Sequence, residues 1–388
     1  MSWPMVPFGE ILRLAPRELV ERRDLPVMSI TMRDGLVDQH EKFKKRIASS
    51  DISTYKVVRS GNLVVGFPID EGVLGFQQRY EAAAVSPAYD IWEATGQHEL
   101  DRQFFERVLR SPTARTIYAA KMRGTTNRRR TIPKEIFRQI EFPLPPLAEQ
   151  KRIAGILDAA DKLRARRRDA LAQLDTLLQS TFLDMFGDPV TNPMGWEVKA
   201  LQGLIQKDRP ITYGILKPGP DTKDGIPYVR VVDIKNEKVL TEQLRRTTPA
   251  IASQYKRSQL IDGDLIMSIR GHVGRMAIVP PGASGTNITQ DTARLALAAA
   301  NATYVMQCLS TQGLQQHMAR RTKGIAVKGI NLGDVKKIPI PVPSLDLQHD
   351  FAAIVESVEE QKVSQRAHLA ELDTLFAALQ QRAFNGEL

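Results

Sequence analysis

The sequence has little of what secreted and membrane proteins carry. It contains one cysteine, Cys308, among its 388 residues, which excludes an intramolecular disulfide and favours a reducing compartment. The N-terminus lacks the apolar core of a signal peptide, and no run approaches the roughly 18 apolar residues that cross a bilayer. We therefore expect a cytoplasmic protein that works away from membranes.

The sequence also lacks the motifs of most nucleic-acid enzymes. No G-x-x-x-x-G-K-[ST] phosphate loop occurs, so we do not expect this chain to bind ATP. The six histidines and the single cysteine form no metal-ligand spacing, and His98, His272 and His317 stand alone. Neither the Asp/Asn-Pro-Pro-Tyr/Phe tetrapeptide of amino-methyltransferases nor a nuclease-like group of carboxylates with lysine is present. The sequence thus predicts recognition without catalysis, with no metal or cofactor in this chain.

The charge balance is basic. The chain has 54 Lys and Arg against 44 Asp and Glu, a net charge of +10. Such a charge favours a polyanionic partner such as nucleic acid, although a basic protein without such a partner stays an alternative. Hydrophobic residues make up 42 % of the chain, which is enough to fill two or more domain cores.

The chain contains a long internal duplication. Residues 140–188 and 338–388 repeat in register at an offset of 198 (341 minus 143), and the block Leu-Asp-Thr-Leu at 174–177 returns at 372–375. Upstream, Trp3 and Phe8 correspond to Trp196 and Leu201. This period is far longer than the roughly 20 to 50 residues of a solenoid repeat, so it indicates two duplicated domains. A pseudo-twofold protein of this kind should meet a ligand that also has two halves.

Each repeat ends in a long helical pattern that follows a proline-rich connector. Apolar residues recur at steps of three and four, which is typical of a heptad-like seam. We expect the two helices to bury these seams in an antiparallel coiled coil, with Arg167 and Gln365 fixing the register; the alternative is that each helix packs only on its own domain. The predicted coiled-coil and partner-docking positions are Ile153, Ile156, Leu163, Leu174, Leu177, Ile354, Val358, Leu369, Leu372 and Leu375.

The rest of each repeat carries short β-branched runs bounded by Gly, Asp or Pro, with helical stretches between them. Examples of the runs are 55–58, 63–65, 228–232 and 265–269, and the helical stretches are 100–110 and 304–318. This mixture predicts the α+β class with a curved sheet in each domain. The expected divisions are a first recognition domain at 1–145, a first helix at 146–188, a second domain at 189–343 and a second helix at 344–388.

Basic glycine loops are the candidate DNA contacts. One loop in the second domain places Arg270, His272 and Arg275 around two glycines, and another basic stretch precedes each proline connector. Arginine can read a guanine edge or clamp a phosphate, whereas the alternative is a hairpin with solvated arginines. Asn287 and Gln290 are further candidate base readers. The predicted DNA-binding residues are Arg123, Asn127, Arg128, Arg129, Arg130, Tyr213, Arg270, His272, Arg275, Lys323 and Lys328.

These features resemble the specificity subunits of type I restriction-modification systems. The resemblance covers the whole chain and is strongest in residues 140–158 with the following Leu-Asp-Thr-Leu helix, and in the ending at 383–388. In the second domain, Ile211-Thr-Tyr-Gly-Ile and Gly263-Asp-Leu-Ile look like a target recognition domain. The first domain departs from this pattern, since Met32-Arg-Asp-Gly stands near the place of the Tyr-Gly stretch. The two domains are therefore expected to read different sequences.

The resemblance implies a non-catalytic subunit in a larger complex. Each recognition domain would read one half of an asymmetric bipartite DNA site, and the helices would fix the spacer. Two methyltransferase subunits would bring S-adenosylmethionine, and two translocase-nuclease subunits would bring ATP and magnesium. A stand-alone DNA-binding regulator and a scaffold subunit of another defence complex are the alternatives, while an enzyme acting alone is disfavoured by the missing motifs.

Overall fold

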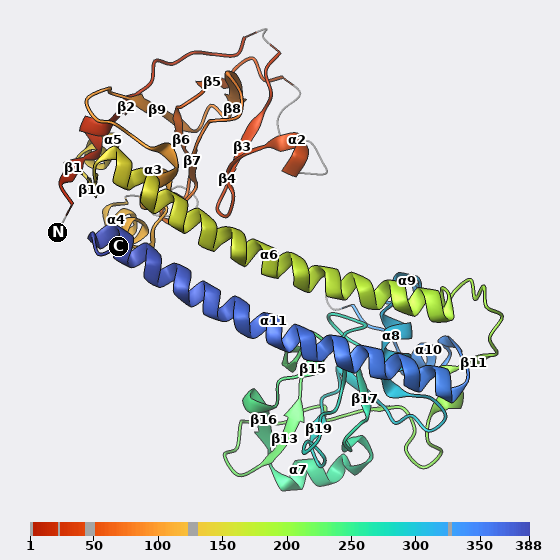
Figure 1. Ribbon diagram of the computed structural model, residues 1–388. Coiled ribbons are helices and arrows are strands. Elements are labelled where there is room, and N and C mark those ends of the chain that lie inside the picture. The colour runs from red at the N-terminus through yellow and green to blue at the C-terminus, as the bar shows by residue number, and fades with distance from the viewer. Residues whose placement is uncertain (1–2, 22–23, 43–50, 123–130, 325–327) are drawn as a thin grey trace. The chain divides into compact units, whose positions relative to one another are not determined.

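The computed structural model describes residues 3–21, 24–42, 51–122, 131–324 and 328–388 (Figure 1). The chain divides into two compact units, of which the first contains residues 1–168 and 368–388 and the second contains residues 169–367. Two long helices, α6 (Leu147–Phe186) and α11 (Leu345–Asn385), each contribute one end to each unit. The compact units thus cut the chain differently from the four segments expected from the sequence, because each part of a helix packs with the domain it covers.

The first unit is built on a four-stranded antiparallel sheet in the order β2-β9-β6-β7. Three antiparallel pairs, β1 with β10, β3 with β4 and β5 with β8, complete its strands. Before α6 its elements are β1 (Met5–Pro7), α1 (Phe8–Ile11), β2 (Leu12–Leu14), β3 (Met28–Thr31), β4 (Gly35–Asp38), α2 (Gln39–Lys42), β5 (Lys56–Arg59), β6 (Leu63–Val65), β7 (Leu74–Phe76), β8 (Ala82–Val85), β9 (Asp90–Ala94), α3 (Arg102–Leu109), α4 (Pro112–Lys121), α5 (Lys134–Arg138) and β10 (Glu141–Pro143).

The second unit also has a four-stranded antiparallel sheet, in the order β12-β20-β17-β18. A three-stranded sheet, β16-β13-β19, and the pairs β11 with β21 and β14 with β15 accompany it. Between the long helices its elements are β11 (Val198–Ala200), β12 (Thr212–Tyr213), β13 (Ile226–Val229), β14 (Ile234–Lys235), β15 (Lys238–Val239), β16 (Arg245–Thr247), α7 (Pro249–Gln254), β17 (Leu265–Ser268), β18 (Met276–Ile278), β19 (Asn287–Ile288), β20 (Thr292–Leu295), α8 (Ala302–Ser310), α9 (Gln312–Arg321), α10 (Leu332–Lys336) and β21 (Pro339–Pro341).

The two four-stranded sheets are topological copies. The strand equivalences are β2 with β12, β9 with β20, β6 with β17 and β7 with β18, and the helix pair α3 and α4 corresponds to α8 and α9. The prediction of an α+β fold with two similar domains is confirmed. In the first unit β2 is the counterpart of the Tyr-Gly strand, whereas Met32–Gly35 belongs to the β3–β4 hairpin.

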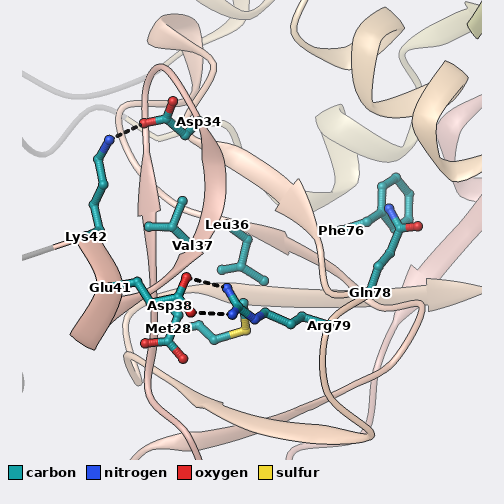
Figure 2. A pocket seen from close by; sticks show the side chains of 10 residues that line it. All are labelled: Met28, Asp34, Leu36, Val37, Asp38, Glu41, Lys42, Phe76, Gln78 and Arg79. Atoms are coloured by element: carbon teal, nitrogen blue, oxygen red, sulfur yellow. Dashed lines mark hydrogen bonds and ion pairs between the residues drawn. The ribbon is translucent and has the colours of Figure 1, made fainter. Parts of the chain in front are cut away.

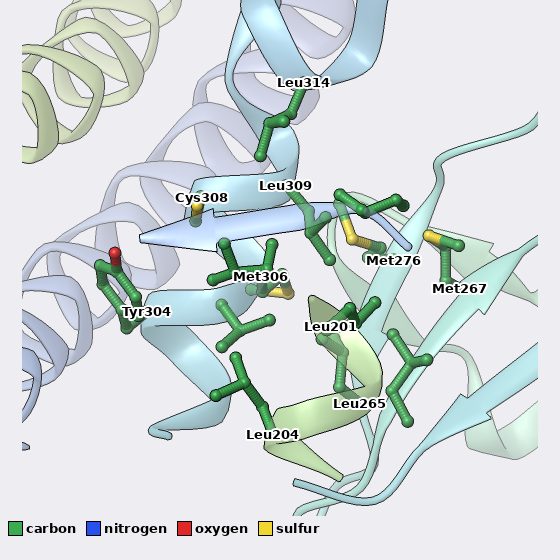
Figure 3. Packing of buried hydrophobic residues seen from close by; sticks show 14 of the residues in the cluster. Leu201, Leu204, Leu265, Met267, Met276, Tyr304, Met306, Cys308, Leu309 and Leu314 are labelled. Atoms are coloured by element: carbon green, nitrogen blue, oxygen red, sulfur yellow. The ribbon is translucent and has the colours of Figure 1, made fainter. Parts of the chain in front are cut away.

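The core of each unit is formed by residues that the repeat makes equivalent. In the first unit Phe8 is fully buried, with its ring centroid 5.0 Å from Trp92 and 4.2 Å from Phe137. In the second unit the core combines aliphatic, sulfur-containing and aromatic side chains, and Figure 3 shows residues of α8 lying against residues of the sheet. Cys308 is part of this core, where burial raises the pKa of its thiol well above the usual value.

A tryptophan at the start of each repeat binds the end of the other repeat's long helix. The indole Nε1 of Trp3 donates to the carbonyl of Ala383 at 3.2 Å. In the second unit the indole Nε1 of Trp196 donates to the carbonyl of Phe186 at 3.0 Å. These two bonds satisfy carbonyl groups of the last helical turn, which have no partner within the helix. The C-terminal end of each long helix therefore packs on the domain of the other repeat.

A buried glutamine anchors the start of each long helix. Gln150 donates its side-chain amide to the carbonyl of Pro145 at 2.8 Å and accepts the backbone N–H of Asp101 at 2.7 Å. Gln348 does the same with Pro343 at 2.9 Å and with Asn301 at 2.8 Å. Asp101 and Asn301 are in turn the N-caps of α3 and α8. The duplicated glutamine thus fixes each long helix to the recognition domain before it.

The long helices run antiparallel in each unit. In the first unit Arg164 of α6 contacts Asp373 of α11, and Arg152 donates to the carbonyl of Leu388 at 2.9 Å. In the second unit Asp175 of α6 pairs with Lys362 of α11, and the ring of Phe186 packs 5.4 Å from that of Phe351.

Within the described residues, no helix is long and apolar enough to cross a membrane.

Candidate nucleic-acid interface

The loop between β17 and β18 is held in a compact shape by a buried serine. The hydroxyl of Ser268 donates to the carbonyl of His272 and accepts the backbone N–H of Arg275 at 2.9 Å. Gly271 and Gly274 have positive φ angles of 72° and 88°, which a side chain would disfavour. The loop therefore exposes Arg270, His272 and Arg275 from a fixed backbone.

The second basic loop of the same domain lies beside the first one. Lys323 and Gly329 exchange two backbone hydrogen bonds of 2.8 and 2.9 Å. Gly271 then donates its N–H to the carbonyl of Lys328 at 2.9 Å. The sequence predicted these two loops separately, and the structure brings Arg270, Lys323 and Lys328 to one end of the domain.

Arg270 lines a hollow of about 560 Å³. Its Nη1 donates to Oε1 of Gln290 at 3.3 Å and lies 3.9 Å from Oδ1 of Asp291. The remaining lining residues are Lys323, Gly329, Ile330 and Asn331. This arrangement combines cationic donors with an amide and a carboxylate, a set that suits the edge of a base.

Arg275 faces a different hollow, of about 450 Å³. That hollow is lined by Ile234, Lys235, Asn236, Glu237, Gly274, Met276 and Ser310. In the sequence Arg270 and Arg275 flank the two glycines of one loop. The structure separates the two arginines instead, because the loop turns at both glycines.

Tyr213 lies on the edge strand β12 and is 45 % exposed. The next residue, Gly214, runs so close to β19 that an added Cβ would lie 1.8 Å from the carbonyl oxygen of Ile288. Ile215 then accepts the backbone N–H of Gln290 at 2.9 Å. The Tyr-Gly stretch thus connects an exposed aromatic ring with the turn between β19 and β20 that carries Gln290.

Asn287 is a structural residue, which corrects its prediction as a base reader. It is buried, and its Oδ1 accepts the hydroxyl of Ser258 at 2.6 Å and the N–H of Ile288 at 2.9 Å. Its Nδ2 donates to the carbonyl of Tyr255 at 3.2 Å. These three bonds hold the buried amide of Asn287 in place at the start of β19.

The first unit has a hollow at the place equivalent to that of Arg270. It measures about 60 Å³ and is lined by Val65, Gly66, Phe67, Ile69, Ala88, Asp90, Trp92, Thr131, Ile132, Lys134 and Phe137. Its two charges are already paired, since Lys134 lies 2.9 Å from Asp90. The candidates Arg123, Asn127, Arg128, Arg129 and Arg130 lie outside the described residues.

A larger hollow of the first unit, about 510 Å³, was not anticipated from the sequence (Figure 2). Two ion pairs line it: Lys42 with Asp34 at 2.7 Å, and Arg79 with Glu41. Hydrogen bonding to Lys42 holds the pKa of Asp34 below its usual value.

The predicted helix positions divide into buried, intermediate and exposed groups. Ile153 and Val358 are buried, and Ile156, Leu174, Leu369 and Leu372 are partly buried. The prediction of a buried seam is wrong for the exposed positions, because neighbouring residues such as Leu157 and Leu178 face the interior instead. The exposed positions are Leu163, Leu177, Ile354 and Leu375, for which partner docking stays a prediction.

Charged residues missed by the sequence reading occupy the contacts between the helices. Lys362 is buried and contacts Asp175 and Glu359 at 2.6 and 2.8 Å. In the first unit Arg164 contacts Asp161 and Asp373 in the same way, with its guanidinium 4.3 Å from the ring centroid of Phe376. Comparing the two repeats at the offset of 198 would have found these charges.

The part of the chain that the structure describes contains no group of three or more His, Cys, Asp or Glu residues that could hold a metal ion.

Comparisons with known proteins point in one direction. The family model described as the type I restriction modification DNA specificity domain matches residues 116–173 and 193–373. The type I restriction enzyme EcoBI specificity subunit of Escherichia coli is 32 % identical over 281 residues, which cover 64 % of this chain and 58 % of that protein. The match thus spans less than two thirds of the relative's length.

Two solved structures share the fold. A chain from work on complex assembly and conformational transition of the type I R-M system superposes with a TM-score of 0.63 at 19 % identity, covering 100 % of this chain and 98 % of that chain. The type I restriction-modification S subunit from M. genitalium gives a TM-score of 0.55 at 15 % identity, covering 99 % and 96 %. At these identities the likeness concerns the fold alone.

Proposed function

Because this chain belongs to the type I restriction-modification DNA specificity family, we propose that it supplies the sequence specificity of such a complex. Each recognition domain reads one half of a bipartite, asymmetric DNA site. The chain itself is not catalytic, and it works in the cytoplasm where the DNA lies. Supporting this proposal are the duplicated domains and the basic loops that gather at one end of the second domain.

One observation carries the bipartite reading. The two recognition domains have the same sheet order, yet the hollows at the ends of β6 and β17 differ in chemistry. The first hollow is mainly apolar, and the second carries Arg270, Gln290 and Lys323. Since groove edges of different base pairs present different donors, acceptors and methyl groups, equal scaffolds with unequal linings suit two different half-sites.

Basic residues of the second domain supply the electrostatic part of binding. Lys323 and Lys328 are exposed beside Arg270, and neither lysine has an ion pair among the described residues. Phosphate contacts of this kind position a protein on the duplex and make its affinity depend on salt. Arg275 and His272 extend the exposed basic surface of the same loop.

The long helices set the spacer between the half-sites in this proposal. An α-helix rises about 1.5 Å per residue, and a duplex about 3.4 Å per base pair. Inserting seven residues into each helix keeps the faces of the helices in phase and adds about 10 Å, or roughly three base pairs. The expected result is a longer unread spacer between unchanged half-sites; changed half-sites would refute this role.

The exposed leucines of the helices are the docking positions for methyltransferase subunits. Leu177 and Leu375 are equivalent at the offset of 198, and each is 49 % exposed. Equivalent exposed positions in two repeats suit two copies of one partner. These partners bring S-adenosylmethionine, and two translocase-nuclease subunits bring ATP and magnesium.

The test is co-expression of the chain with its methyltransferase partner, followed by sequencing that detects N6-methyladenine in the host DNA. We expect one two-part motif with a fixed unread gap, which disappears when the chain is omitted. A verified complex that adds no methylation would contradict the proposal. Tight, site-specific DNA binding by the chain alone would then favour a regulator, and its absence would favour a scaffold subunit.

A further inference from the structure

Arg270 stands at the same place in the second sheet as Pro68 does in the first. Leu265, the first residue of β17, pairs with Leu295 of β20, and Leu63, the first residue of β6, pairs with Trp92 of β9. Arg270 and Pro68 each lie five residues after that first strand residue. Both hollows are closed by the residues before α10 and α5, namely Gly329 and Ile330 in one unit and Thr131 and Ile132 in the other. The hollows are thus equivalent positions with different linings.

The backbone at Arg270 is fixed on both sides. Ile269 and Arg270 donate their N–H groups to the carbonyl of Asp291 at 2.8 and 3.3 Å. Ile330 donates to the carbonyl of Ile269 at 2.9 Å, and Arg270 bridges to Gly329. A side chain that starts from such a backbone can be aimed, which base recognition requires and phosphate contact does not.

The contacts within the protein orient the guanidinium of Arg270 but leave some of its N–H donors free. Its side chain is 52 % exposed, and both of its polar contacts, to Gln290 and Asp291, use Nη1. Within the described residues the Nε and Nη2 groups of Arg270 have no hydrogen-bond partner. An arginine edge with two parallel N–H groups matches the O6 and N7 acceptors of guanine in the major groove.

The neighbouring carboxylate favours a base over a phosphate. Asp291 Oδ1 lies 3.9 Å from Nη1 of Arg270, so a phosphate at this arginine would meet a like charge. The neutral acceptors of guanine meet no such repulsion. Three other arginines of this unit are already used inside it: Arg209 with Asp264, Arg230 with Asp233, and Arg294, which is buried.

We propose that Arg270 reads a guanine in the half-site of the second domain, and that Gln290 and Asp291 are the residues that position it. This inference rests on the proposed function. Lys323 and Lys328 contact phosphates on either side of that base. The first domain has no arginine at this position, so it reads its half-site without this contact.

The experiment is selection from duplexes randomised at the second half-site, using the full chain assembled with its methyltransferase partner. We expect the wild-type complex to prefer G at one position, and Arg270→Ala to reduce that preference by about 5- to 150-fold. Arg270→Lys, which keeps the charge and the stem, should not restore it, because lysine lacks the two parallel donors. Gln290→Ala should also reduce the preference for G at that position, because Gln290 orients Arg270.

Arg275→Ala is the matched control, since it removes the same group from the same loop but from the other hollow. Because Arg275 adds only to the basic surface of the loop, this variant should weaken binding to all sequences alike and leave the preference for G unchanged. An unchanged preference in both Arg270 variants, or an equal loss of affinity for all sequences, would overturn the inference while leaving the proposed function intact. A wild-type complex that selects no sequence at all would instead overturn the proposed function.

Discussion

The ammonium group of Lys362, on α11, lies 2.6 Å from a carboxylate oxygen of Asp175, on α6. An equivalent pair joins Arg164 of α6 to Asp373 of α11 at 2.5 Å, since 362 minus 164 and 373 minus 175 both equal 198. Asp175 and Asp373 are the acids of the two Leu-Asp-Thr-Leu blocks. The aspartate of each repeated block therefore pairs with a cation from the other repeat: Asp175 with Lys362, and Asp373 with Arg164.

Lys362→Ala should lower the thermal unfolding midpoint of the chain. It removes a buried aliphatic stem and leaves the carboxylates of Asp175 and Glu359 without their shared cation, at a cost of about 1 to 2 kcal/mol. Lys362→Met keeps the volume of the stem and should cost less, because an apolar residue can replace a buried charge. Scanning calorimetry measures the unfolding midpoints of both variants. An alanine variant with the same midpoint as the wild type would exclude a stabilising role for Lys362.

Glu359 should make part of this stability depend on acid pH. Burial alone would raise the pKa of Glu359, but hydrogen bonds and charges from Lys362 and Lys238 outweigh it and hold the pKa below its usual value of 4.5. A lowered folded-state pKa means that the stabilisation is present above pH 4.5 and is lost as the pH falls through the folded-state pKa.

The midpoint difference between wild type and Glu359→Gln is the measurement for this pH dependence. This difference should have its largest value at neutral pH and should become smaller below pH 4.5. A difference that stays constant through acid pH would show that the charge of Glu359 does not contribute.

Gly214→Ala should disrupt the second recognition domain. The new Cβ would lie 1.8 Å from the carbonyl oxygen of Ile288, so β12 must move away from β19, at a cost of about 3 kcal/mol or more. Gly155→Ala is the control: it lies in α6 with nothing within 4 Å, and alanine there should stabilise by about 0.5 to 1 kcal/mol. Equal midpoints for the two variants would contradict the close approach.

Asn287→Ala should reduce stability rather than change base preference. The substitution removes the acceptor of the Ile288 N–H and one of the two acceptors near the Ser258 hydroxyl, which keeps the carbonyl of Tyr255, at a cost of about 1 to 3 kcal/mol. Thermal unfolding and duplex selection on the same preparation separate the two effects. A stable variant with an altered half-site would make Asn287 a base reader after all.

Leu177→Arg and Leu375→Arg should each weaken the binding of one methyltransferase subunit by at least about tenfold, and the double variant should lose both. Both side chains are exposed, so the fold should tolerate the changes. Val232→Arg, at a residue 58 % exposed elsewhere in the second unit, is the control. Native mass spectrometry gives the stoichiometry; two bound subunits on the double variant would place the docking surface elsewhere.

Local sequence patterns were sufficient for the elements and the duplication. The long helices follow from apolar spacing after proline connectors, and the strands β5, β6, β13 and β17 from short β-branched runs. The expected helix at 304–318 is broken, because α8 ends at Ser310 and α9 begins at Gln312. The equivalence of Trp3 with Trp196 also predicted equivalent places, although not the helix ends that the two indoles bind.

The candidate site was predictable only as a set of basic loops. Arg270 and Arg275 are alike in the sequence, and their different hollows arise from neighbours such as Gln290 and Lys235 that lie far away in the chain. Asn287 and Gln290 were both plausible readers. Burial beside Ser258 makes the first structural, while the hollow keeps the second accessible.

The sequence by itself determined the duplication, the α+β class and the family, because periodicity and repeated motifs are properties of the chain. Only the tertiary structure decided which of the adjacent residues Leu177 and Leu178 is buried, and which cation each repeated aspartate holds. Adjacent leucines satisfy a heptad pattern about equally well, and an ion pair forms between side chains that meet in space. These choices therefore depend on contacts across the fold rather than along the chain.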